Sequence, residues 1–184
     1  MQQHLSWQET INRALSVHTD IPSSRFLQLA TVDIHGQPHC RTLVFRGFDQ
    51  DKNQLYLHTD KRSEKIAQLE SNNRVETCWY FSETREQFRF KGQIECIGHL
   101  DAALKQTRSR SKQQLRLAHW QNLSDALRES YGANYSHAQP DENFTLLIVH
   151  ITQVDYLRLA PLPHLRLLYS LDEQGTWQTK AGSP

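Results

Sequence analysis

The sequence has few cysteines and no long apolar run. Its three cysteines, Cys40, Cys78 and Cys96, are far apart and form no C-x-x-C pair. This argues against a disulfide framework or a zinc site, and we expect three buried free thiols. No segment approaches the roughly 18 apolar residues that span a bilayer, and residues 1–6 have neither the basic region nor the apolar core of a signal peptide. We therefore expect a cytoplasmic protein without membrane contacts.

Net charge is also nearly absent. Lys and Arg together number 21 against 20 Asp and Glu, so the formal net charge is +1. No overall field attracts nucleic acid or an acidic membrane, and we expect neither as a partner. Any anion site must therefore be local. The 184 residues contain no linker or repeat, and with 38% hydrophobic content they fit one domain, residues 1–184.

The usual hydrolytic and nucleotide-binding motifs are missing as well. The sequence contains no G-x-S-x-G, P-loop, G-x-G-x-x-G or H-E-x-x-H pattern. Its ten histidines are scattered, and only His35 and His39 lie close together, across a turn. Neither a third histidine nor a carboxylate of suitable spacing accompanies them, so we interpret them as solvated turn residues and predict no metal site.

The first half of the chain predicts one helix followed by strands. Ser6 to Glu9 form a capping box, apolar residues then recur at helical spacing, and Ile21-Pro22 ends the helix. From Arg25 the period changes to two. The predicted strands cover residues 25–33, 38–47, 54–59, 74–81 and 86–96, and a short helix at 63–71 has Ile66, Ala67 and Leu69 facing inward. Short turns at 33–38 and 49–53 predict that the first three strands form an antiparallel meander.

The second half predicts more helix, then a long strand and a hairpin. Helical character runs from residue 101 to about 131, with an interruption at 107–111. The predicted strands cover residues 144–159, 165–171 and 176–180. In the strand at 86–96, the residues Phe88, Phe90, Gly92, Ile94 and Cys96 fall on one face. Seven or eight short strands must protect their edges, so we predict a mainly β (α+β) fold, an antiparallel Greek-key barrel with peripheral helices.

Basic residues on strands and at one helix start form the candidate site. Arg41 and Arg46 lie on the second predicted strand, and Lys65 lies in the helix that Ser63 opens. The planar guanidinium group matches phosphate oxygens, and N–H groups at a helix start add a further anion site. The competing interpretation is that these are ordinary solvated charges. An ideal strand would point Arg41 and Arg46 to opposite faces, so a bulge or the end of the sheet must reconcile them.

Three segments resemble, in order, the FMN-binding segments of the pyridoxamine 5'-phosphate oxidase family. They are RTLVFR at residues 41–46, HTDKRSEK at 58–65 and EQFRFKG at 86–92. The ending, from Leu165 through Trp177 to Pro184, resembles the C-terminal hairpin of that family. The resemblance covers nearly the whole chain. It implies a split β-barrel that forms a homodimer and holds FMN at each end of the interface.

The resemblance also assigns phosphate contacts. Arg41 and Lys65 are expected to hold the FMN phosphate between two cations, while Thr59 and Ser63 donate hydrogen bonds beside them.

Four further residues are expected to approach the flavin ring. Arg46 takes the place of a family lysine near the ring, and Gln87 aligns with a glutamine that bonds its polar edge. Gln121 and Arg166 are expected from the partner subunit, where Arg166 brings positive charge close to the flavin. The competing interpretation is an exposed strand residue for Gln87 and a surface hairpin charge for Arg166.

The substrate half of the resemblance is weak. Around residues 104–113 the family uses a tyrosine, an arginine and a serine for the substrate phosphate, and here Leu104, Arg108 and Lys112 correspond to them. Leu162 replaces an arginine, although the following His164 is kept. Leu157 replaces a tryptophan that packs near the flavin. Arg108, Lys112 and His164 remain as candidate substrate-binding residues.

These observations favour a flavin oxidoreductase with a small-molecule substrate other than pyridoxamine 5'-phosphate itself. In this hypothesis FMN carries the redox chemistry, and the protein orients it and sets its electrostatic surroundings. A protein that carries or senses FMN without turnover is the alternative. A haem-binding split barrel is a third hypothesis, for which no axial histidine stands out.

Overall fold

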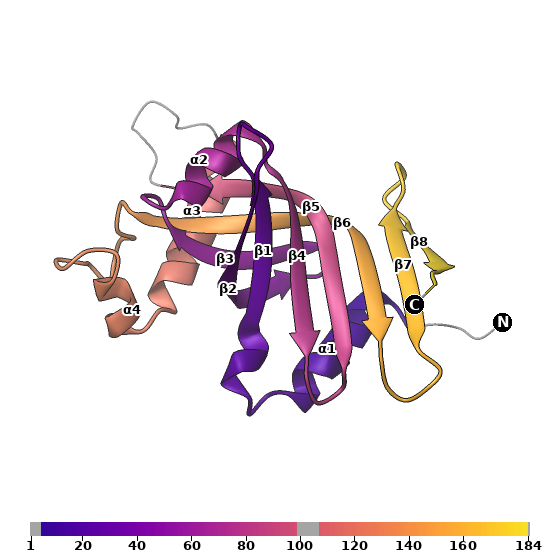
Figure 1. Ribbon diagram of the computed structural model, residues 1–184. Coiled ribbons are helices and arrows are strands. Elements are labelled where there is room, and N and C mark those ends of the chain that lie inside the picture. The colour runs from indigo at the N-terminus through magenta and orange to yellow at the C-terminus, as the bar shows by residue number, and fades with distance from the viewer. Residues whose placement is uncertain (1–4, 99–106, 184) are drawn as a thin grey trace.

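Eight antiparallel strands make one sheet that closes into a barrel, described here by a computed structural model covering residues 5–98 and 107–183 (Figure 1). The strands are β1 Phe26–Val32, β2 Pro38–Asp49, β3 Gln54–Asp60, β4 Arg74–Phe81, β5 Glu86–Ile97, β6 Phe144–Arg158, β7 Leu165–Leu171 and β8 Trp177–Ala181. Their order is β3-β2-β1-β4-β5-β6-β7-β8, and an additional β3–β6 pairing closes the first six into a barrel. The hairpin of β7 and β8 extends the sheet beyond it. The predicted barrel and its opening meander are confirmed.

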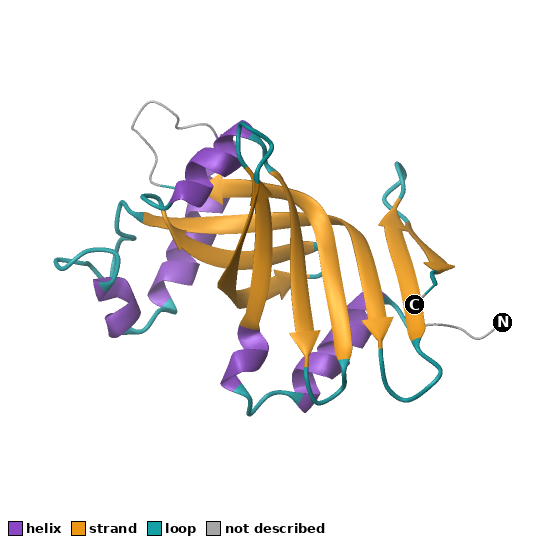
Figure 2. Ribbon diagram, in the orientation of Figure 1, coloured by secondary structure: helices purple, strands orange, loops and turns teal. Residues whose placement is uncertain are grey.

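The helices lie around the periphery of the sheet (Figure 2). They are α1 Trp7–Val17, α2 Glu64–Ser71, α3 Thr107–Gln121 and α4 Asp125–Glu129, with a short 3-10 helix at Pro22–Arg25. The predicted capping box is present at α1, where Glu9 N–H donates to Ser6 Oγ and Ser6 N–H donates to the Glu9 carboxylate. None of the helices in the described ranges is long and apolar enough to cross a membrane.

Aromatic side chains fill the barrel. Trp7, Trp79, Phe81, Phe88 and Phe90 are each fully buried. Trp79 Nε1 donates a hydrogen bond of 2.7 Å to a backbone carbonyl, so its one polar atom is satisfied inside the core. Because one face of β1, β4 and β5 is committed to this core, their other face forms the outer surface of the sheet.

Three local predictions were wrong. No interruption occurs at 107–111, because α3 starts at Thr107 and runs unbroken to Gln121, in a stretch whose Arg, Lys and Gln residues favour helix. The predicted helical residues before Thr107 lie outside the described part of the chain. In α2, Ala67 is exposed and Gln68 is buried instead, since the Gln68 side chain accepts a hydrogen bond of 2.6 Å from Thr31.

The third wrong prediction concerns the thiols. Cys40 and Cys96 are exposed and Cys78 is only partly buried. Cys96 follows the alternation of β5 but lies where the barrel core has ended. At that point Ile97, on the opposite face, is buried in a separate cluster against Leu115 of α3.

Gly92 marks a register shift between β5 and β6. Lys91 pairs with Gln153 and Gly92 with Ile151, which leaves Thr152 as an extra residue on β6. A Cβ atom at Gly92 would lie 2.0 Å from the backbone oxygen of His150. The close approach of the two backbones therefore requires glycine.

We expect Gly92→Ala to lower the free energy of unfolding by about 1–3 kcal/mol, because one of the two backbones must move. Gly98→Ala is the matched control, since its Cβ would meet only Thr145 Oγ1 at 3.8 Å. Urea unfolding followed by tryptophan fluorescence measures both. Equal stability of the two variants would contradict this role for Gly92.

Candidate functional site

Four of the residues proposed from sequence come together at one end of the barrel. Arg41 lies on β2 opposite Leu29, whose side chain is in the core, and Thr59 lies near the end of β3. Ser63 is the N-cap residue of α2, and Lys65 follows in its first turn. Lys65 Nζ donates to Thr59 Oγ1 at 2.8 Å and also to Ser63 Oγ. We call these four residues the cation site.

The guanidinium group of Arg41 is held by neutral acceptors. Its Nη1 donates to Thr31 Oγ1 at 2.6 Å, and its Nη2 donates to Gln68 Oε1 at 2.9 Å. Thr31 and Gln68 are themselves buried. The sequence did not indicate these two residues, because they come from β1 and α2 and meet only in the folded chain.

The charges of the cation site are not neutralised by the protein. Burial lowers the pKa of Lys65, and the positive charge of Arg41 lowers it further. Burial also lowers the pKa of Arg41. Among the described residues, no carboxylate lies within 4.0 Å of either cation, and the nearby Asp60 is paired with Arg62 at 2.5 Å. Two adjacent, partly buried cations without a counter-ion form a site that suits a dianion such as a phosphate.

The start of α2 adds to this site. Ser63 has extended backbone angles and its side chain caps no backbone N–H group of the helix. The N–H groups of the first turn therefore lack this common partner. Their direction and the helix dipole favour a negative group at the same place.

Arg46 does not join the cation site. Phe45 pairs with Leu57 and Gly47 with Tyr56, so Arg46 is the extra residue of a bulge in β2. The predicted bulge is therefore present, but it leaves Arg46 near the α3 side of the barrel. There His58 Nε2 and His119 Nδ1 are 3.0 Å apart.

The surroundings of Arg46 are cationic or neutral. The pKa of His58 falls to about 2, chiefly through burial and then through His119 and Arg46. Nε of Arg46 is buried without a hydrogen-bond partner among the described residues. The contact between His58 and His119 joins β3 to α3, and no local sequence signal indicated it.

Gln87 and Arg166 lie on the outer face of the sheet. Across β4, β5, β6 and β7, the register aligns Tyr80, Gln87, Leu157 and Arg166 in one row, which we call the outer row. Residues that pair across neighbouring strands have their side chains on the same face of the sheet. Cys78 lies on the face of the outer row and pairs with Gln28 of β1, so Gln28 also lies on that face. The next residue, Leu29, faces the core and pairs with Arg41. The outer row and Arg41 therefore lie on opposite faces of the sheet.

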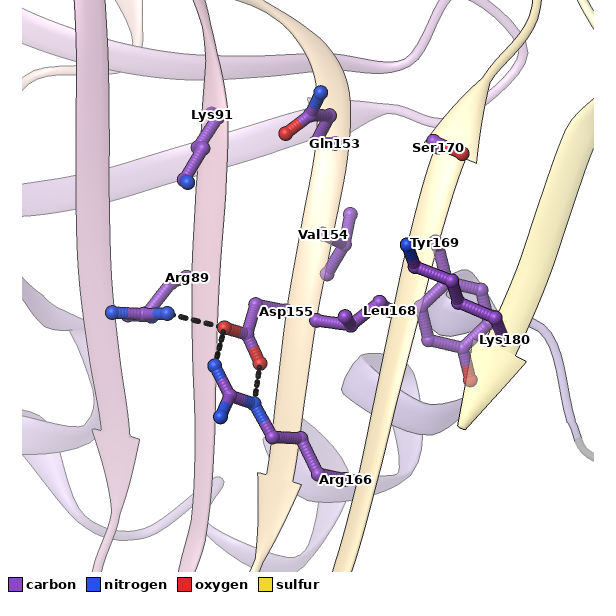
Figure 3. A pocket seen from close by; sticks show the side chains of 10 residues that line it. All are labelled: Arg89, Lys91, Gln153, Val154, Asp155, Arg166, Leu168, Tyr169, Ser170 and Lys180. Carbon is purple, nitrogen blue, oxygen red and sulfur yellow. Dashed lines mark hydrogen bonds and ion pairs between the residues drawn. The ribbon is translucent and has the colours of Figure 1, made fainter. Parts of the chain in front are cut away.

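Arg166 is held in place by a carboxylate. Its Nε and Nη2 donate to the two oxygens of Asp155 at 3.0 and 2.8 Å, and Arg89 donates to the same carboxylate (Figure 3). Burial opposes ionisation of Asp155, but the hydrogen bonds from Arg166 and Arg89 outweigh it and lower its pKa. Glu76 also lies 3.4 Å from Arg89 Nε, so these two guanidinium groups are matched by two carboxylates.

The candidate substrate residues are not assembled. Lys112 forms an ion pair with Glu95, and His164 is exposed on the connection between β6 and β7. Arg108 lies in α3, but its side chain and Leu104 are outside the described part. The side chain of Gln121, at the end of α3, is exposed. In the described ranges no three His, Cys, Asp or Glu side chains are grouped to hold a metal ion.

Comparison with known proteins identifies the family of the chain. A family model described as the FMN-binding domain of pyridoxamine 5'-phosphate oxidase matches residues 4–98, more than half of the chain. The chain belongs to this family. FMN is the cofactor of the matched domain, and the match includes the cation site, Arg46 and Gln87. Gln121, Lys112, His164 and Arg166 lie beyond it.

Two relatives show how much of the chain resembles other members of the family. A pyridoxamine 5'-phosphate oxidase-related, FMN-binding protein of Nostoc punctiforme is 38% identical, with a TM-score of 0.89 over 99% of both chains. Pyridoxine/pyridoxamine 5'-phosphate oxidase 2 of Arabidopsis thaliana is 42% identical over 91 residues, 50% of this chain and 46% of that protein. The chain thus spans about half the length of this curated relative of the family.

A more distant member of the fold is PhzG of Burkholderia lata, whose structure is a complex with tetrahydrophenazine-1-carboxylic acid. It is 19% identical, with a TM-score of 0.70 over 100% of this chain and 95% of that one. At this identity the likeness extends to the fold alone.

We expect the double variant Arg41→Ala with Lys65→Ala to lose FMN. Two charge-assisted phosphate contacts of about 1.5–3 kcal/mol each would disappear, which corresponds to roughly 10²–10⁴-fold weaker binding. Flavin absorbance after gel filtration and titration of the apoprotein with FMN measure the change. Lys61→Ala with Arg62→Ala is the matched control, because these exposed cations are paired with Glu142 and Asp60. Unchanged affinity in the first variant would refute the phosphate assignment.

Proposed function

We propose that this protein is an FMN-dependent oxidoreductase that acts on a small organic molecule. The observation that supports this best is the cation site, where Arg41 and Lys65 lie close together without a carboxylate partner among the described residues. A phosphate dianion there would offset the burial and the repulsion from Arg41 that lower the pKa of Lys65. Bound FMN would supply hydride and electron transfer to the site.

The chain's own residues would bind and orient the cofactor. Arg41 and Lys65 hold the phosphate, while the hydroxyl groups of Thr59 and Ser63 donate beside them. Thr31 and Gln68 keep the guanidinium group of Arg41 in one orientation through hydrogen bonds of 2.6 and 2.9 Å. Such preorganisation reduces the entropy lost on binding.

We infer that a second copy of the chain completes the site. Arg41 and the outer row lie on opposite faces of the sheet, so the outer row of one subunit is available to a flavin whose phosphate is held by the other. Arg166 would act from the partner in this way, and Gln87 shares the row with Arg166. Gln121, exposed at the end of α3, is proposed to approach the flavin from the partner as well. Phe26 and Tyr80, each 46% exposed on the outer face, offer apolar area for such a contact.

We expect a dimer in light scattering, and we expect Phe26→Glu to shift it toward monomer and to weaken FMN retention. Ile34→Glu is the matched control, because Ile34 is 76% exposed on the turn between β1 and β2. A wild-type monomer that retains stoichiometric FMN would refute the shared site.

The substrate is proposed to differ from pyridoxamine 5'-phosphate. The ammonium group of Lys112 is already engaged by Glu95, and Leu162, in the place of a family arginine, is 78% exposed and offers no charge. His164 by itself can orient a substrate ring but cannot hold a phosphate. Misplacement by about 1 Å can lower a rate on the order of a hundredfold.

With FMN-loaded protein, we expect pyridoxamine and pyridoxine 5'-phosphate to give peroxide far more slowly than about 1 per second, the lower end of common enzyme turnover. A steady-state peroxide assay with both compounds is the measurement. Turnover at or above that value would show that the substitutions at Lys112 and Leu162 do not exclude these substrates. Anaerobic bleaching of the flavin by reduced organic compounds would separate an enzyme from an FMN carrier.

A further inference from the structure

A hollow of about 370 Å³ opens on the outer face of the sheet, over β5, β6, β7 and β8. Leu168 contributes an apolar side chain to its floor, and Lys91, Ser170 and Lys180 lie around it (Figure 3). An apolar floor with a few polar groups at its edge is typical of small-molecule sites, and the volume lies in their usual range.

The hollow carries an excess of positive charge. Arg89, Lys91, Arg166 and Lys180 line it, and Asp155 is the only carboxylate among its described lining residues. Asp155 is fully used by the two guanidinium groups. Glu76, nearby on β4, lies 3.4 Å from Arg89 Nε and 3.8 Å from Lys91 Nζ. Four cations therefore face two carboxylates.

Lys91 and Lys180 are the cations of the hollow whose ammonium groups can still donate hydrogen bonds to a ligand. The ammonium group of Lys180 makes no hydrogen bond or ion pair with any described residue, and the one ion pair of Lys91 Nζ among the described residues is the long one to Glu76. Both are exposed, and they stand on β5 and β8, on opposite sides of Leu168 (Figure 3). Three strand spacings of roughly 5 Å separate these strands, which leaves room for a flat molecule between the ammonium groups.

We propose that this hollow binds the anionic part of a small organic acid, with its carboxylates toward Lys91 and Lys180 and its apolar body on Leu168. Charge-assisted hydrogen bonds to both lysines would fix the acid, and burial of Leu168 would add apolar contact.

The hollow adjoins the outer row, because Arg166 lines it and Arg89 follows Gln87 by two residues on the same face of β5. This inference rests on the proposed function. The acid is the substrate, and it is held so that its remaining part reaches the flavin ring near Gln87 and Arg166. The substrate class is then a carboxylic acid, recognised by residues other than Arg108, Lys112 and His164.

Calorimetric titration of the FMN-loaded protein with isophthalate tests this inference. We expect saturable binding, weakened about tenfold by Lys91→Ala or by Lys180→Ala and more by both together, and retained in Lys180→Arg. Lys52→Ala is the matched control, since this exposed lysine lies on the turn between β2 and β3 and is paired with Asp49. Isophthalamide, which has the same shape without charge, should not bind.

Two readouts keep the site and the proposed function apart. Isophthalate should shift the visible spectrum of bound FMN if the hollow adjoins the ring. Absence of isophthalate binding, or equal binding by all the variants, would overturn the inference even when FMN is fully retained. Isophthalate binding to a protein that holds no FMN would overturn the proposed function and the substrate role, and leave only an acid-binding hollow.

Discussion

The double pairing of β6 is the constraint on which the rest of the structure depends. The first half of this strand pairs with β3 on one side and with β5 on the other, and its second half pairs with β5 and β7. Val149, for example, pairs with Leu55 of β3 and with Ile94 of β5. This closes the barrel over an aromatic core and removes two sheet edges. It also fixes the end of β3, where Thr59 pairs with Thr145, and so positions the cation site.

The two irregularities of the sheet have different consequences. The bulge at Arg46 places a cation on the α3 side of the barrel, away from Arg41, although the two residues belong to one short motif. The shift at Gly92 lets β5 approach β6 so closely that no side chain fits. Each changes which face the following residues occupy, which is how bulges redirect side chains.

The two faces of the sheet thus have separate chemistry. At the end of the inner face, Arg41 and Lys65 donate hydrogen bonds to neutral acceptors, which orient them while their charge stays available. On the outer face, Asp155 holds Arg89 and Arg166 together beneath the open hollow. A ligand held by the inner face of one copy and by the outer face of a second copy would occupy a shared site. A shared site would therefore make cofactor binding and assembly depend on each other.

The sequence by itself determined what local rules govern. Alternation and turn residues located the strands, the capping box located α1, and the segments at 41–46, 58–65 and 86–92 located the flavin-binding family. The sequence did not predict contacts between segments that are far apart along the chain. Gln68 is buried because it accepts a hydrogen bond from Thr31, and Lys112 is unavailable because it forms an ion pair with Glu95. Cys96 is exposed because the barrel core ends before it. The outer row and the hollow likewise exist only through the register of β4 to β8. Periodicity assigns a residue to a face of its own strand, but the partner across the sheet is chosen by closure and packing of the whole chain.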